Sequence, residues 1–184
     1  MEQTLTTEER AALLRTAREA VEARLAGRKP QYPAAAGNLG SKRGAFVTLT
    51  RRGKLRGCIG FVIAERPLLA TVEEAAQASA FQDPRFPPLT HAEFAEVRIE
   101  ISVLSEPRPV RGVEEIRVGT HGLIVRKGHR SGLLLPQVAA EYGWDRDTFL
   151  DHTCLKAGLP AGCWRESGTK IELFSAEVFG EEGA

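Results

Sequence analysis

The sequence predicts an α+β fold, in which a mostly antiparallel sheet is accompanied by helices. Two hairpin signals, over residues 45–63 and 123–135, predict pairs of antiparallel strands. Alternating apolar and polar residues predict a further half-buried strand over 97–104. Helical segments separate these strands without the regular strand–helix repeat of a βαβ protein, and the chain contains no internal repeat.

The N-terminal segment predicts a helix that begins after Thr6. Thr6 and Glu9 have the spacing of a capping box, in which each side chain accepts a hydrogen bond from the other residue's backbone N–H. The helix ends before Gly27 and Pro30, and residues 31–44, rich in Pro, Ala and Gly, predict a loop. The apolar stripe of the helix consists of Leu14, Ala17, Val21 and Leu25.

A hairpin is predicted next, with strands over 45–50 and 55–63 joined by a turn at 51–54. A helix is predicted over 67–80, because proline is well suited to the first helical turn. The following stretch, 81–89, contains three prolines and predicts a loop.

The second half of the chain carries similar signals. Thr90 and Glu93 repeat the capping-box spacing and predict a short helix before the strand over 97–104. The elements predicted after that strand are a hairpin of 123–125 and 133–135, helices over 136–142 and 147–157, and a last strand over 171–179.

Composition excludes several functional classes. The chain has 184 residues, and its 25 Lys and Arg residues are balanced by 24 Asp and Glu residues, for a formal net charge of +1. This balance argues against broad electrostatic attraction to nucleic acid or to an anionic membrane. No apolar run approaches the roughly 18 residues that cross a bilayer. We therefore expect neither a nucleic-acid nor a membrane partner.

The three cysteines, Cys58, Cys154 and Cys163, form no CxxC pair, and their odd number argues against a disulfide scaffold. Cys154 and Cys163 also make a poor zinc set with His152, because the spacing and the number of ligands are wrong. The N-terminus lacks the basic start and apolar stretch of a signal peptide. The expectation is three unpaired thiols in a reducing cytoplasm, with no metal.

The most informative segment is Leu-Arg-Gly-Cys-Ile-Gly-Phe at residues 55–61. A regular strand here would place its apolar residues on the core face and the thiol on the opposite face. The predicted core face consists of Leu55, Gly57, Ile59 and Phe61. The opposite face consists of Arg56, Cys58 and Gly60.

This pattern is typical of a reactive cysteine. Arg56 would lie roughly 6.5 Å from Cys58 along the strand and would favour the thiolate. Gly57 and Gly60 lack a Cβ atom and let a ligand or another backbone come close. The alternative is that Cys58 is a small buried residue in a glycine-rich strand.

The hexapeptide at residues 55–60 resembles the signature of the AMMECR-type domain family. Further family motifs occur in the expected order: Phe46–Leu49, Asp83–Phe86, Ile101–Leu104, His121–Gly122, Leu134–Val138 and Lys156–Leu159. The resemblance extends over about residues 10–180. It therefore assigns 1–184 to a single AMMECR-type domain, with two sub-lobes as an option.

The resemblance implies an α+β unit with a larger and a smaller lobe flanking a cleft near the signature strand. Bacterial and archaeal family members are labelled protein A of the AmmeMemoRadiSam system, which implies a functional association with a Memo-type protein and a radical SAM enzyme. The family is described as uncharacterised, with an enzymatic role proposed from its cysteine motif. The chain lacks a Cx₃Cx₂C motif, so it is not itself the radical enzyme.

Other residues complete the predicted site. Asp83 could orient Arg85, whose guanidinium could clamp a carboxylate or phosphate, or Asp83 could simply cap a turn. His121 is the best candidate for a base that activates Cys58, although a lone histidine is often structural or exposed. Gln137 lies at a helix start, where backbone N–H groups can hold an anion.

The leading hypothesis is an enzyme or enzyme subunit that uses Cys58, with His121 and Asp83, in hydrolysis or group transfer on an unknown small molecule or protein. No cofactor is expected. The predicted substrate-binding residues are Arg56, Gly57, Gly60, Arg85 and Gln137. The alternative is a non-catalytic adaptor that associates with Memo-type and radical SAM proteins. Glu100, on the predicted strand over 97–104, has three possible roles: a residue of a solvated face, a partner in an ion pair, or an acid of the site.

Overall fold

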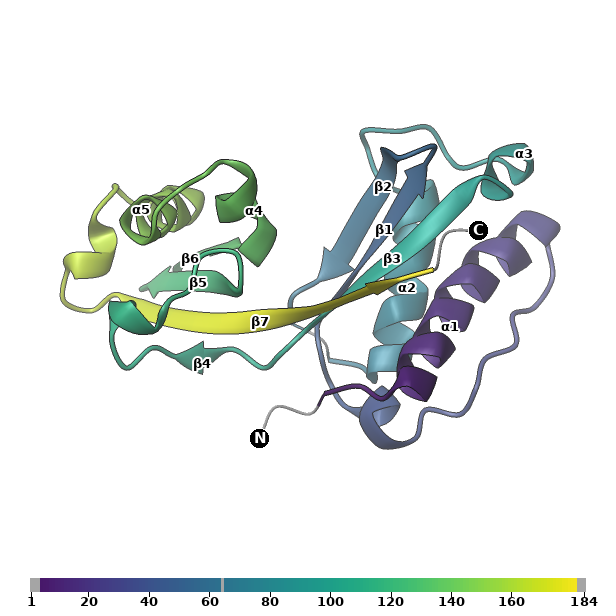
Figure 1. The fold of residues 1–184 in the computed structure, drawn as a ribbon, viewed down its shortest axis with the longest axis horizontal. Helices are drawn as coiled ribbons and strands as arrows, with labels where there is room; N and C mark the ends of the chain where they lie inside the picture. The colour runs from purple at the N-terminus through teal and green to yellow at the C-terminus, as the bar shows by residue number, and fades with distance from the viewer. Residues whose placement is uncertain (1–3, 64, 182–184) are drawn as a thin grey trace. The chain divides into compact units, whose positions relative to one another are not determined.

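The computed structural model describes residues 4–63 and 65–181 and divides into two compact units (Figure 1). Unit 1 contains the described residues up to Leu104 together with those from Glu177 onward. Unit 2 contains Ser105–Ala176. The last strand, β7, contributes residues 170–176 to unit 2 and residues 177–180 to unit 1. Each unit has helices and antiparallel strands, so the predicted α+β class is confirmed.

Unit 1 combines a small antiparallel sheet with helices. The strands run in the order β2–β1–β3, β3 is followed by β7, and β2 is the edge strand. Its elements are α1 (Thr7–Ala26), a 3₁₀ turn (Gly37–Gly40), β1 (Ala45–Arg51), β2 (Lys54–Phe61), α2 (Leu68–Phe81), α3 (His91–Phe94) and β3 (Val97–Leu104). Both predicted capping boxes, Thr6 with Glu9 and Thr90 with Glu93, are present.

Helices α1 and α2 cover one face of this sheet and form the core of unit 1 with it. Strand β1 alternates buried and half-buried residues, and its buried residues Ala45, Val47 and Leu49 pack against the helices. The face that these helices do not cover is called the non-helical face below. Because residues paired across strands point to the same side of a sheet, the pairing register decides which residues occupy it.

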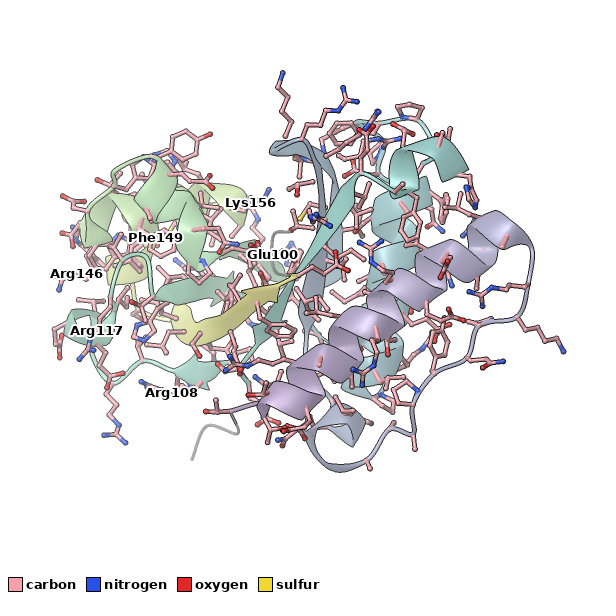
Figure 2. All side chains as sticks on the ribbon, turned by 45° about the vertical axis from the view of Figure 1, so that its right-hand side comes forward. Glu100, Arg108, Arg117, Arg146, Phe149 and Lys156 are labelled. Atoms are coloured by element: carbon pink, nitrogen blue, oxygen red, sulfur yellow. A yellow bond between two sulfur atoms is a disulfide. The ribbon has the colours of Figure 1, made fainter. Side chains whose placement is uncertain are left out.

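Unit 2 contains further antiparallel strands and has its own core. Strand β7 pairs with β5 on one side and with β4 on the other, and β5 pairs with β6. Its elements are β4 (Arg108–Pro109), a 3₁₀ turn (Val113–Glu115), β5 (His121–Lys127), β6 (Arg130–Leu134), α4 (Pro136–Glu141), α5 (Arg146–Lys156), the 3₁₀ turn η3 (Cys163–Arg165) and β7 (Lys170–Gly180). Phe149, labelled in Figure 2, is fully buried on α5 and anchors this core.

The expectation of three unpaired cysteines is wrong, because Cys154 and Cys163 form a disulfide. Cys154 lies on α5 and Cys163 on η3, with both side chains fully buried. The chain turns back between them with Gly158 and Gly162 in the left-handed region. Disulfides are rare in reducing compartments outside hyperthermophiles. The pairing therefore removes the cysteine-based argument for a reducing compartment.

Within residues 4–63 and 65–181, no helix has both the length and the apolar character that a transmembrane span requires.

Candidate functional site

Cys58 lies in the middle of β2 and is half-buried, with a free thiol. It pairs directly with Thr48 on β1, so the two side chains share the non-helical face. The Thr48 hydroxyl donates a hydrogen bond to Cys58 Sγ over 3.3 Å. A donor at this position stabilises a thiolate more than a neutral thiol.

Helix α2 contacts β2 at the residues before and after Cys58, Gly57 and Ile59. A Cβ atom on Gly57 would lie 2.1 Å from the Ser79 carbonyl oxygen, so only glycine allows this approach of helix and strand. The buried Ser79 hydroxyl accepts a hydrogen bond from the Ile59 N–H over 2.8 Å and donates one to the Val47 carbonyl over 2.7 Å. This hydroxyl therefore bridges the paired residues Val47 and Ile59 of β1 and β2.

The outer edge of β2 at Cys58 is held by Asp83 and Arg85, from the loop after α2. The Cys58 N–H donates to Asp83 Oδ2 over 2.9 Å, and Arg85 Nη2 donates to the Cys58 carbonyl over 3.3 Å. Arg85 also binds Asp83 through Nε at 2.9 Å and Nη2 at 2.7 Å. The predicted pairing of Asp83 with Arg85 is therefore present, and both residues contact the Cys58 backbone.

Electrostatics keep this ion pair charged. The Asp83 side chain is only 1% exposed. Hydrogen bonds from the Arg85 guanidinium, and then from the Cys58 N–H, hold the pKa of the Asp83 carboxyl well below its usual range despite burial. The same contact with Asp83 raises the pKa of Arg85, and the nearby sulfur of Cys58 adds to that effect. Asp83 is thus a fixed carboxylate and not a proton donor at neutral pH.

Arg56 is predicted to act on the Cys58 thiol or on a substrate, but its guanidinium binds Glu93. It is buried, and its guanidinium binds Glu93 through Nε and Nη2 at 3.1 Å each and the Pro87 carbonyl at 3.0 Å. Glu93, which also caps α3, has its pKa lowered to about 2, chiefly by this contact with Arg56. The role of Arg56 in tuning the thiol or binding substrate stays a prediction, and its charge is offset by Glu93.

The predicted core position of Leu55 is wrong. Leu55 is 43% exposed, and it pairs with Thr50 on the same face as Cys58. The cause is a β-bulge: Gly57 pairs with Leu49 and Leu55 with Thr50, which leaves Arg56 as the extra residue of β2. The bulge shifts the alternation of side chains between the two faces by one position. From Gly57 onward the residues therefore lie on the faces predicted for them, whereas Leu55 lies on the opposite face.

The remaining predicted residues fall in several environments. A Cβ atom on Gly60 would lie 2.4 Å from the Phe46 ring, so this ring occupies the space beside the glycine. His121 and Gln137 belong to unit 2. His121 begins β5 and its Nδ1 accepts a hydrogen bond from the Arg117 N–H, whereas Gln137 is exposed in the first turn of α4. The pairing of His121 with Cys58 stays a prediction.

Three residues that contact this site were missed. Thr48 lies within one of the family motifs but carried no chemical prediction by itself. Ser79 is a polar residue among the apolar residues of α2, a weak signal for a buried hydroxyl. Glu93 was identified as a capping residue, but its bond to Arg56 joins positions 37 apart in sequence.

Comparison with known proteins decides the family. The AMMECR1 family profile matches residues 14–179. This chain belongs to the AMMECR1 family. A protein of Methanopyrus kandleri is 47% identical over 99% of this chain and 93% of its own length, and one of Methanothermobacter thermautotrophicus is 44% identical over 97% of both.

The AMMECR1 fold is also represented among solved structures. The crystal structure of an uncharacterized protein from Pyrococcus horikoshii is similar with a TM-score of 0.79 and 46% identity, covering 92% of this chain and 90% of that one. None of these names states an activity.

Proposed function

We propose that this AMMECR1 protein is a cysteine-dependent enzyme, or the catalytic subunit of one, with Cys58 as its nucleophile. The observation that carries the proposal is the hydrogen bond from Thr48 to a half-buried, free thiol whose backbone is fixed on both sides. A positioned thiol with a hydrogen-bond donor suits covalent catalysis. The reaction is hydrolysis or group transfer through a covalent intermediate at sulfur.

Arg85 suggests which substrates would bind there. Its side chain is 54% exposed although it is anchored on Asp83, so part of the guanidinium faces outward beside the Cys58 carbonyl. A planar guanidinium binds carboxylates and phosphates well. We therefore favour a substrate that carries an anionic group near the bond that Cys58 attacks.

The test is the pH dependence of Cys58 alkylation by iodoacetamide in the folded protein. Cys154 and Cys163 form a disulfide, so Cys58 is the free thiol among the described residues and the reagent reports on it directly. A reaction midpoint below the ordinary thiol pKa of about 8.5 supports the proposal. An ordinary or raised midpoint contradicts it, and Cys58→Ala serves as the blank.

The second candidate is an adaptor that associates with Memo-type and radical SAM proteins. It is favoured by exposed apolar side chains near both ends of β2, Leu55 and Ile63, of the kind that partner proteins cover. In this case Cys58 contributes shape and not reactivity. If Cys58→Ala keeps both co-purification with such partners and cellular activity, the adaptor is correct and the nucleophile is not.

A further inference from the structure

Three side chains from three neighbouring strands stand in one row on the non-helical face of unit 1. Thr48 on β1 pairs with Cys58 on β2 on one side and with Glu100 on β3 on the other. Directly paired residues project to the same face, so the thiol, the hydroxyl and the carboxylate are neighbours in that order. Figure 2 labels Glu100 on β3, on the side of the strand away from α1.

The spacing of the strands sets how far the thiol lies from the carboxylate in this row. Adjacent strands lie about 4.8 Å apart, so the Cα atoms of Cys58 and Glu100 are separated by roughly 10 Å across two strand spacings. The central residue, Thr48, has a short side chain that is turned toward the sulfur. A water molecule that bridged a small acyl group on Cys58 and the Glu100 carboxylate would therefore lie above Thr48.

Glu100 differs from the acids that surround the β2 site, because those acids are held in ion pairs. Glu93 and Glu96 are ion-paired with arginines, and Asp83 is held by Arg85. Within the part of the chain that the structure describes, the Glu100 side chain takes part in no hydrogen bond or ion pair, and the residue is exposed on β3. An unpaired carboxylate next to the site can accept a proton from water.

We propose that Glu100 is the general base that activates water to hydrolyse an acyl group carried by Cys58. The inference rests on the proposed function and specifies it as hydrolysis of an ester, thioester or amide. The water gives one proton to the Glu100 carboxylate while its oxygen bonds to the acyl carbon. The carbon–sulfur bond then breaks, the acid product leaves, and the sulfur departs as a thiolate that Thr48 stabilises. Glu100 finally returns its proton to the thiolate or to solvent.

The test uses p-nitrophenyl acetate with the full chain and follows two quantities. Release of p-nitrophenolate reports acylation of Cys58, and mass spectrometry of the intact protein reports how long the acetyl group remains there. We expect the wild type to be acylated and to turn over. Glu100→Gln should be acylated at a similar rate but should lose the acetyl group on the order of 10²-fold more slowly, because general-base catalysis is typically that large.

Matched variants separate this inference from the proposed function. Glu74→Gln removes a carboxylate on α2, over the opposite face, and should behave like the wild type. Glu100→Asp keeps the carboxylate and should recover part of the deacylation rate. If Glu100→Gln loses the acetyl group as fast as the wild type, or if the acetylated wild type is stable, the role of Glu100 is overturned. If wild-type Cys58 is not acylated at all, the nucleophile itself is overturned.

Discussion

The two units of the protein use sulfur in opposite ways. In unit 2, Cys154 and Cys163 are fully buried and bonded to each other. In unit 1, Cys58 is half-buried and free. Its backbone is held by hydrogen bonds with the loop after α2, and the backbone of the next residue, Ile59, is held by a hydrogen bond with α2. The covalent link stabilises a segment by consuming both thiols. The non-covalent arrangement fixes the backbone and leaves the thiol available.

This difference shows that a reactive side chain can be positioned through its backbone, so that the side chain itself need not stabilise the fold. Around Cys58, the holding contacts come from Ser79, Asp83 and Arg85, and they are made to the backbone of β2. The thiol itself accepts a hydrogen bond from the Thr48 hydroxyl. We therefore expect changes in the holding residues to affect stability, and changes beside the thiol to affect reactivity.

The largest effect on stability is expected at Gly57, where α2 and β2 approach each other closely. In Gly57→Ala the new Cβ atom would lie 2.1 Å from a backbone oxygen of α2, so helix and strand must separate. We expect the free energy of unfolding, measured by urea denaturation, to fall by about 3 kcal/mol. Gly53→Asn is the control, because nothing lies within 4 Å of that turn glycine and asparagine tolerates its positive φ. An equal loss in both variants would contradict the close-approach argument.

The disulfide of unit 2 should come next. It closes a short loop between positions nine apart, so replacing both Cys154 and Cys163 by alanine should lower the free energy of unfolding by about 2.5 kcal/mol. Thermal denaturation of the variant and the wild type measures the effect. Cys58→Ala should change the melting temperature far less. A melting temperature that depends on Cys58 more than on the disulfide would reverse the comparison.

Asp83→Asn tests the contacts that hold the β2 backbone, and we expect an effect of intermediate size on stability. The asparagine keeps similar volume but loses the charge that binds Arg85, and one of its two groups is a donor where an acceptor is needed. We expect a loss of about 2 kcal/mol in the free energy of unfolding, since hydrogen bonds to charged groups contribute more than neutral ones. Glu74→Gln, at an exposed ion pair, should cost under 1 kcal/mol. Equal effects at the two sites would show that Asp83 has no special role.

Acid should weaken unit 1 through the same contacts. The pKa values of Asp83 and Glu93 are both lowered in the folded protein, so their stabilisation is present above the unfolded pKa of about 4 to 4.5 and is lost as the pH falls toward 2. Urea denaturation at several pH values measures this slope. Asp83→Asn and Glu93→Gln should each flatten it, and an unchanged slope in both would contradict the assignment.

The smallest effect on stability, but a clear one on reactivity, is expected at Thr48. Thr48→Val keeps the shape of the side chain and removes the donor to Cys58 Sγ. Loss of a donor that stabilises the thiolate should slow alkylation of Cys58 near neutral pH by roughly three- to tenfold. Thr50→Val is the control, because Thr50 lies two residues after Thr48 on the same face of β1 and pairs with Leu55 instead of Cys58. A similar slowing in both variants would argue against a specific hydrogen bond.

Much of the fold was predictable because its signals are local. The capping boxes at Thr6 and Thr90 depend only on neighbouring residues, and both are present. The strand over 97–104 is present too, but its burial alternates only as far as Glu100, and residues 101–104 are all buried. Local alternation failed at Leu55, because the register of β2 is set by pairing with β1 and by a bulge at Arg56. No signal within residues 54–61 marks that bulge.

The site was predictable in part for the same reason. Cys58, Asp83 and Arg85 lie within recognisable motifs, and the structure brings these three together. The bond of Arg56 to Glu93 and the pairing of Cys154 with Cys163 depend on how distant segments meet. Such partners follow from the tertiary fold and not from spacing along the chain.

The contacts of Asp83 and Arg85 with the Cys58 backbone have one more consequence. An edge strand exposes unpaired N–H and C=O groups that can recruit a strand from another molecule and start aggregation. Here a carboxylate accepts the outward N–H and a guanidinium donates to the outward C=O, so together they take the place of a neighbouring peptide group. The loop that fixes the Cys58 backbone thereby also protects the edge of the sheet at this residue, and we expect its loss to lower the solubility of the protein as well as its stability.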